Sequence, residues 1–173
     1  LVLNLPAVPG AARTWLPGEP AYLSLRPLLR KPCSWQVEGR NVYVCENPNI
    51  VAIVADRLGA DSAPLVCTDG MPAAAQRILL DQLTSAGARL LYHGDYDWPG
   101  IGIGNMVMRT WQAAPWRFGC TDYLEAVILA PTRPRDLDSN GVEARWDKEL
   151  HTAMDVQGLA IPEEAVFGTL LDD

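Results

Sequence analysis

The sequence predicts an α/β fold, in which a mostly parallel sheet of about four strands is flanked by helices and followed by two C-terminal helices. Short apolar runs alternate along the chain with longer segments that have the spacing of a helix. The apolar runs are nearly continuous, which is typical of parallel strands that helices cover on both faces. The chain has 173 residues, 49% of them hydrophobic, and this suffices for one domain with a core of ordinary size.

The first 40 residues are predicted to be a linker that leads into one α/β domain at residues 41–173. The first half of this linker is rich in prolines and glycines, which oppose regular structure: Pro6, Pro9, Gly10, Pro17, Gly18 and Pro20. Residues 21–32 form a short amphipathic segment whose structural type the pattern does not decide. The chain begins at Leu1 rather than Met, which is consistent with a piece of a longer protein.

Three strand–helix units are predicted after the linker. Each pairs an apolar run with a longer segment of helical spacing. The three pairs are residues 41–46 with 49–60, residues 63–70 with 71–87, and residues 88–95 with a helix that begins at Pro99. Gly59 stops the first helix, and Pro72 lies near the first turn of the second. Asp69-Gly70 closes the second strand, because this pair favours a tight turn.

The C-terminal part is predicted to add one strand and two helices. Residues 123–131, with the sequence YLEAVILAP, are predicted to be the fourth strand. After a polar break, residues 142–158 and 161–173 have helical spacing. The second of these helices begins with Pro162 and two acids, which the helix dipole favours in a first turn.

The net charge of −7 argues against a surface that holds polyanions by itself, since Lys and Arg supply most of the affinity for nucleic acid. A role on nucleic acid therefore needs a local basic patch, a bound cation or another domain. The basic residues that we expect near a phosphate backbone are Arg109, Arg117, Arg133 and Arg135. No apolar run is long enough to span a membrane. The four cysteines form no C-x-x-C pair, so we expect a reduced, cytoplasmic protein.

Three acids are expected at the carboxyl ends of the predicted strands, where sites form in open parallel sheets. Glu46 ends the first strand, and Asp95 and Asp97 follow the third. Two carboxylates of one tight turn repel each other, so each is pushed toward protonation unless a cation is present. Mg²⁺ takes oxygen ligands and is typically held by one or two carboxylates together with substrate phosphates. The pattern therefore predicts a Mg²⁺ site, which Mn²⁺ could also fill.

Each candidate residue also has a structural alternative. A D-x-D pair after a strand is by itself more often a turn and a helix cap, and Asp97 could cap the helix near Pro99. Asp69 could lend a fourth carboxylate or only form its turn. His93 could shuttle a proton or bind phosphate, although a structural histidine is more common at a strand end. Three tryptophans could stack on unpaired bases, although core packing is the more frequent role: Trp98, Trp111 and Trp116.

Three segments resemble the Toprim fold of topoisomerases, primases and related nucleases, in which a Glu ends the first strand and D-x-D follows a later one. These segments are VYVCENPN, LVCTDGMP and YHGDYDWPGIGI. GDYDWPGIGI is similar to the D-x-D-P-x-G variant of the topoisomerase VI A subunit and its meiotic recombination relatives, although Trp98 here separates the second Asp from Pro99. The resemblance implies that Glu46, Asp95 and Asp97 hold the metal and carry the catalysis.

A resemblance to the C-terminal domain of unknown function 2399 covers most of the chain. It rests on segments in the same order: GEPAYLSLRPLL, ENPNIVAIVADRL, CTDGMPAAAQRILLDQL, GDYDWPGIGI and GLAIPEEAVFGTLL. This domain is the Toprim-like part of bacterial proteins similar to the nuclease subunit of Wadjet plasmid-defence systems. The resemblance implies condensin-like ATPase partners and a further N-terminal half. Topoisomerase relatives cut DNA with a tyrosine on a separate winged-helix domain, and residues 1–40 are too few to form such a domain. The resemblance therefore also implies either cleavage by hydrolysis or an incomplete chain.

We therefore expect a Mg²⁺-dependent endonuclease that acts on DNA, with Glu46 as a metal ligand or the general acid/base. A second interpretation is a non-catalytic Toprim-like module that binds metal or a partner in a larger DNA-associated assembly, which the low isoelectric point favours mildly. A phosphotransferase is less well supported, because that chemistry normally places D-x-D at the first strand with a later lysine. The two lysines, Lys31 and Lys148, lie outside the strand–helix units. The oligomeric state stays open, a dimer included.

Overall fold

The computed structural model describes residues 1–7, 16–30, 32–129, 135–138 and 141–170. The chain divides into two compact units, residues 1–91 and residues 92–173. Its described strands form a five-stranded sheet in the order β1-β3-β2-β4-β5 and a two-stranded sheet of β6 and β7. The predicted α/β class with a mostly parallel sheet is therefore confirmed.

The sheet of the first unit is built on β2 (Asn41–Cys45) and β3 (Leu65–Cys67). These two strands run parallel, with Val44 opposite Val66. β4 (Arg89–Tyr92) follows β2 in the strand order. All three strands lie within segments that the sequence predicts as strands, and the apolar runs correspond to side chains that are largely buried.

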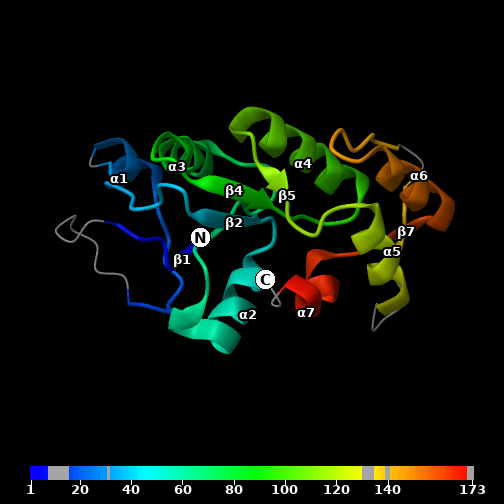
Figure 1. Cartoon of the computed structure of the whole chain (residues 1–173), viewed down its shortest axis with the longest axis horizontal. Helices are drawn as coiled ribbons and strands as arrows, with labels where there is room; N and C mark the ends of the chain where they lie inside the picture. Colours follow the sequence, from blue (N-terminus) through cyan, green and yellow to red (C-terminus); the bar gives the residue numbers. More distant parts are fainter. Residues whose placement is uncertain (8–15, 31, 130–134, 139–140, 171–173) are drawn as a thin grey trace. The chain divides into compact units, whose positions relative to one another are not determined.

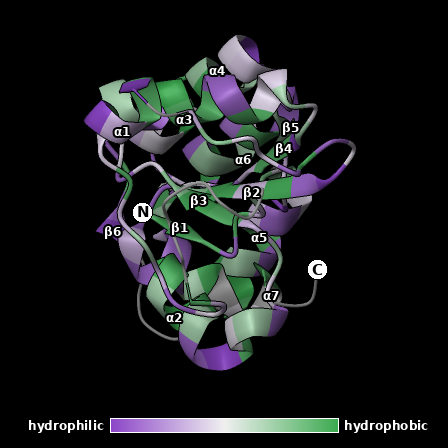
Figure 2. Cartoon of the chain, turned by 90° about the vertical axis from the view of Figure 1, so that its left-hand side faces the viewer, coloured by the Kyte–Doolittle hydropathy of each residue, from purple (hydrophilic) through white to green (hydrophobic). Residues whose placement is uncertain are grey.

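Two helices cover opposite faces of β2 and β3 (Figure 1). α2 (Pro48–Leu58) begins at Asn47, whose side chain accepts the Asn49 N–H, and it ends at Gly59 as predicted. α3 (Ala74–Ser85) lies on the other face and buries leucines toward the strands. Figure 2 shows the strands largely in the hydrophobic colour between these helices. This two-sided cover explains why the strands are continuous apolar runs rather than alternating ones.

The N-terminal segment contributes regular structure, and the prediction that its prolines and glycines exclude this is wrong. β1 (Val2–Leu3) pairs antiparallel with β3, and both of its side chains are buried. The strand ends before Pro6, so it keeps the backbone N–H groups that pairing requires. α1 (Leu25–Arg30) gives the undecided segment a helical structure. The domain boundary at residue 41 stays a prediction, and Pro9 and Gly10 lie outside the described residues.

The second unit is predominantly helical. Its elements are α4 (Trp98–Trp111), β5 (Ala114–Pro115), α5 (Cys120–Leu129), β6 (Arg135–Asp136), α6 (Lys148–Gln157), β7 (Leu159–Ala160), η2 (Glu163–Val166) and α7 (Phe167–Leu170). Aromatic and aliphatic side chains fill its core, and fully buried members include Tyr92, Tyr96, Phe118, Tyr123 and Met154. Among the described residues, no helix has the length and apolar character needed to cross a membrane.

The prediction of a fourth strand at residues 123–131 is wrong, because most of this segment belongs to helix α5. Its buried residues Tyr123 and Ala126 are three positions apart, which is the spacing of a helix. The start of the helix is capped from two directions, since Asp122 Oδ2 accepts the Gly119 N–H at 3.0 Å and Asp147 Oδ2 accepts the Cys120 N–H at 2.7 Å. The outer face is also apolar, and for this reason the segment resembles a strand in sequence. Residues 130 and 131 lie outside the described part of the chain.

The two closing helices exist but are shorter than predicted. α6 begins only at Lys148, where Asp147 Oδ1 accepts the Glu149 N–H at 3.0 Å and so caps the helix. The second is a 3₁₀ turn, η2, that continues into the short α7. Glu163 and Glu164 occupy the first turn of η2 directly after Pro162, as predicted.

Candidate functional site

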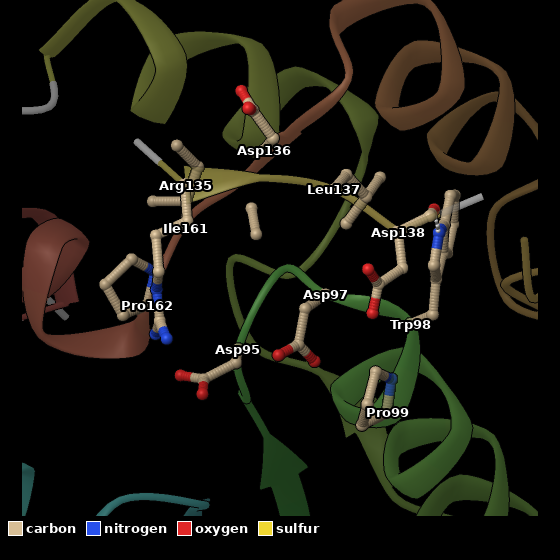
Figure 3. A pocket seen from close by; sticks show the side chains of 11 residues that line it. Asp95, Asp97, Trp98, Pro99, Arg135, Asp136, Leu137, Asp138, Ile161 and Pro162 are labelled. Carbon is tan, nitrogen blue, oxygen red and sulfur yellow. Dashed lines mark hydrogen bonds between the residues drawn. The ribbon is translucent and has the colours of Figure 1, made fainter. Parts of the chain in front are cut away.

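Asp95 and Asp97 line one cavity of about 160 Å³ in the second unit. They come from the turn between β4 and α4 (Figure 3). The opposite wall comes from β6, from the residues that follow it and from the end of β7: Arg135, Asp136, Leu137, Asp138, Ile161 and Pro162. The D-x-D pair therefore belongs to a walled site and not to an open surface turn.

Tyr96, between the two acids, fixes the turn. It exchanges two backbone hydrogen bonds with Ile161, at 2.9 and 3.1 Å. Its buried side chain donates from the hydroxyl to the Arg117 carbonyl at 2.9 Å. Since successive side chains of an extended segment point to opposite sides, burying Tyr96 turns Asp95 and Asp97 away from the core and toward the cavity.

Each acid also accepts one backbone hydrogen bond. Asp97 is the N-cap of α4, and its Oδ1 accepts the Gly100 N–H at 2.7 Å. Asp95 Oδ1 accepts the Glu163 N–H at 2.7 Å, at the start of η2. The capping role considered for Asp97 is thus confirmed. A carboxylate has about four acceptor sites, so one hydrogen bond leaves each acid able to bind a cation as well.

The electrostatics of Asp95 fit two acids held close together. Burial raises the pKa of the Asp95 carboxyl above its ordinary value, and the negative charges of Asp97 and Glu164 raise it further. The hydrogen bond from Glu163 and the charge of Arg135 act in the opposite direction without cancelling the rise. The repulsion predicted from the D-x-D spacing therefore acts on Asp95, and a cation in the cavity would relieve it.

Two features of the opposite wall escaped the sequence reasoning. Trp98 donates from its indole N–H to the Asp138 carbonyl, which ties this segment to the start of α4. In Figure 3 the Asp138 carboxylate is directed toward Asp97, whereas that of Asp136 points away. Asp138 lies in a polar stretch with no regular spacing, so nothing in the sequence indicates that it would line the cavity.

Glu46 and Asp69 belong to the first unit. Glu46 directly follows β2, as predicted, and its Oε2 is buried. Asp69 is exposed and has a left-handed φ of 56°, followed by Gly70 at 77°. The Gly70 N–H donates to the Glu46 carbonyl at 3.3 Å, so the loops that follow β2 and β3 are joined. The turn at Asp69-Gly70 is confirmed, and the catalytic role of Glu46 stays a prediction.

His93 is enclosed by aromatic rings. Only 1% of its surface is exposed, and its Nδ1 lies 2.8 Å from the Trp116 carbonyl oxygen. The rings of Tyr96 and Phe118 lie within 5.7 and 5.0 Å of the imidazole, centre to centre. Burial lowers the pKa of His93 to about 4, although the hydrogen bond to Trp116 opposes the shift. These contacts favour the structural alternative for His93 over a proton shuttle.

The predicted base-stacking and phosphate-contacting residues separate into distinct groups. The tryptophans are buried, which confirms core packing for them: Trp98, Trp111 and Trp116. Arg109 is exposed at the end of α4, and Arg117 lines a different cavity with Asp122 and Glu125. Arg135 lines the cavity of the acids. Arg133 lies outside the described residues.

Two carboxylates suit a hard divalent cation, since Mg²⁺ keeps several waters and needs one or two protein ligands. Asp95 and Asp97 would hold such an ion. Across the described ranges, no three His, Cys, Asp or Glu side chains gather into a complete metal site. Any remaining ligands would therefore come from water, from a substrate or from rearrangement of side chains.

The fold and the cavity define an α/β protein with an acidic turn after a strand. Comparison with known families makes this more specific. The sequence model described as "Protein of unknown function C-terminus (DUF2399)" matches residues 21–173, so the chain belongs to this family. The predicted resemblance to domain 2399 is thereby confirmed, and the match begins within the predicted linker. A search of curated proteins finds no significant match.

Proposed function

We propose that this chain is a metal-dependent, DNA-cleaving domain of the Toprim class, acting at the cavity of Asp95 and Asp97. One observation carries the proposal: two carboxylates of a single turn line one cavity, and burial together with the charge of Asp97 raises the pKa of the Asp95 carboxyl. A site that holds two repelling acids is suited to a divalent cation, and a cation lets an acidic surface accept phosphate.

Four residues have distinct roles in the proposed reaction. Asp95 and Asp97 hold Mg²⁺ or Mn²⁺, which when bound polarises a phosphate and lowers the pKa of a bound water. Arg135 is a basic residue that lines the cavity, and its planar guanidinium is suited to bind a phosphate oxygen of the DNA backbone. Glu46, on the resemblance to Toprim proteins, is a metal ligand or the general acid/base.

The wider setting follows from the same resemblance. A chain similar to the nuclease subunit of Wadjet systems would cut plasmid or phage DNA within a bacterial defence complex, together with condensin-like ATPase subunits. The net charge of −7 supports such a division of labour, because DNA affinity would then come from other parts of the protein or from its partners.

A second function is favoured by one specific observation. Asp95 and Asp97 each accept a backbone N–H, so both acids have a structural task that needs no metal. A non-catalytic Toprim-like module that binds a partner would keep the same turn.

The deciding experiment measures metal-dependent nicking of plasmid DNA by the full-length protein or its assembled complex. Glu46→Gln and Asp95→Asn keep side-chain shape, and loss of general acid/base function typically costs about 10²- to 10⁴-fold in rate. Asp122→Asn is the matched control, because Asp122 also accepts a backbone N–H but lies outside the cavity. A melting curve accompanies each variant. Near-normal cleavage by folded Glu46→Gln would refute its catalytic role, and loss of folding in both site variants would favour the structural function.

A further inference from the structure

Cys45 and Cys67 lie opposite each other at the ends of β2 and β3. They are register partners in the parallel pairing of the two strands. Neighbouring strands are about 4.8 Å apart, and disulfides join Cα atoms that are about 4.4–6.8 Å apart. Both residues are reduced and fully buried in the structure. The backbone therefore already holds the two thiols at a separation that a disulfide can span.

The two thiols also interact with each other and with the loop that follows β2. The side chains of Cys45 and Cys67 are hydrogen-bonded to each other. Cys67 donates from its thiol to the Glu46 carbonyl, with sulfur and oxygen 3.4 Å apart. Cys45 donates to the Asn47 carbonyl at 3.7 Å. Two thiols in contact, one to attack an oxidant and one to resolve the product, are what a reversible disulfide needs.

We propose that Cys45 and Cys67 form a redox-sensitive pair, which a hydroperoxide converts into an intramolecular disulfide. The Cys67 thiolate attacks one peroxide oxygen and breaks the O–O bond, which yields a sulfenic acid and, with one proton, water. The Cys45 sulfur then attacks the Cys67 sulfur and displaces the sulfenic oxygen as a second water. Two thiols and one hydrogen peroxide thus give one disulfide and two waters, and a dithiol reductant reverses the change.

Oxidation would act on the loop that carries Glu46. Both S–H donors disappear when the disulfide forms, so the carbonyls of Glu46 and Asn47 lose the hydrogen bonds that the thiols supply. Asn47 is the N-cap of α2. The loop between β2 and α2 would therefore change its hydrogen bonding while the two strand ends become covalently joined.

The test treats the folded, full chain with hydrogen peroxide, then unfolds it in an alkylating reagent and maps each cysteine by peptide mass. We expect Cys45 and Cys67 to lose alkylation together and to appear as one joined peptide pair. The same treatment in urea should give mixed pairings with Cys33 and Cys120, which are half-buried in the fold. Recovery of both strand cysteines as thiols, while Cys33 and Cys120 react, would overturn the proposal.

A background variant, Cys33→Ser/Cys120→Ser, removes competing thiols. In this background the joined pair should still form and should disappear on addition of dithiothreitol. Adding Cys45→Ala should stop the reaction at a sulfenic acid on Cys67, which dimedone labels. Absence of the label from that variant, or a sulfinic acid on Cys67 while Cys45 is still present, would contradict the pairing.

Discussion

Gly100 in α4 lies against the carbonyl group of Asp95. A Cβ atom at position 100 would overlap the Asp95 carbonyl oxygen and lie 3.1 Å from Asp97 Oδ1. The same residue donates its N–H to Asp97 Oδ1 at 2.7 Å. The first turn of α4 and the acidic turn therefore form one tightly packed unit, in which only glycine leaves room for the backbone.

Gly100→Ala should destabilise the protein, because the added methyl group would clash with the backbone carbonyl of Asp95. Overpacking of this kind costs about 1–3 kcal/mol, and each kcal/mol lowers the melting temperature of a domain this large by about 2–4 °C. Gly102→Ala is the control in the same helix, since nothing lies within 4 Å of a Cβ at that position. Alanine there should be neutral or stabilising by up to about 1 kcal/mol. Equal melting temperatures for the two variants would contradict the close approach to Asp95.

Asp95→Asn should raise the melting temperature at neutral pH in metal-free buffer. The folded state raises the pKa of Asp95 above its ordinary value of 3.8, so its ionised form is disfavoured in the fold and stability falls as pH rises through the folded pKa. Asparagine removes the charge and can still accept the Glu163 N–H. The gain should shrink toward the acid limit, where Asp95 is protonated in both states. Melting curves across the acidic and neutral range measure the difference in melting temperature between Asp95→Asn and the parent. A variant that is less stable than the parent at neutral pH would contradict the destabilising effect of the Asp95 charge.

His93 should make the protein less stable as pH falls below its ordinary pKa. The fold lowers the pKa of His93 from 6.5 to about 4, so the unfolded chain binds the proton first and stability is lost between these two values. The effect amounts to at most about 3 kcal/mol. His93→Asn can still donate toward the Trp116 carbonyl, and it should flatten the slope of melting temperature against pH in this window. An unchanged slope in His93→Asn would show that groups other than His93 cause the dependence of stability on pH.

Local signals in the sequence were sufficient for the strands β2, β3 and β4, for the helices α2 and α3, and for the acidic turn. Val44 and Val66 lie in apolar runs that are continuous because helices cover both faces, and this pattern is readable without any distant contact. The D-x-D pair was recognisable because two carboxylates one residue apart share a turn. The cap of Asp97 was visible because Pro99 lies two positions after it, in the first turn of the predicted helix.

The remaining features depend on residues far apart in the sequence. Helix α5 was mistaken for a strand because its outer face is apolar, and the cap that favours a helix comes from Asp147, 27 residues further along the chain. β1 was missed because its pairing partner lies in β3. Arg135 and Asp138 reach the acidic cavity only through the pairing of β6 with β7 and the bond from Trp98.

Mg²⁺ or Mn²⁺ should raise the melting temperature through Asp95 and Asp97, because an ion that binds only the folded state stabilises it by mass action. At about 100 times the dissociation constant the gain is about 2.7 kcal/mol, which corresponds to roughly 5–10 °C. Asp97→Asn should remove most of this shift and keep the fold, since asparagine caps a helix as well as aspartate does. Asp122→Asn should keep the full shift. Equal shifts in Asp97→Asn and the parent would refute the metal assignment.

This chain alone should bind duplex DNA poorly at physiological salt. It carries 14 Lys and Arg against 21 Asp and Glu, so its surface as a whole repels the phosphates whose neutralisation supplies most of the affinity. Binding should be weaker than the range of about 10⁻⁴ to 10⁻⁶ M that is typical of non-specific DNA-binding proteins. The proposed division of labour predicts that an N-terminal half or condensin-like partners strengthen this binding. Fluorescence anisotropy with a labelled duplex across a salt series measures both the affinity and its salt dependence.

Arg135→Gln is the matched variant within the cavity, and it should weaken only metal-dependent binding. Tight binding by this chain that falls steeply with salt would reveal a basic face at variance with the proposed division of labour.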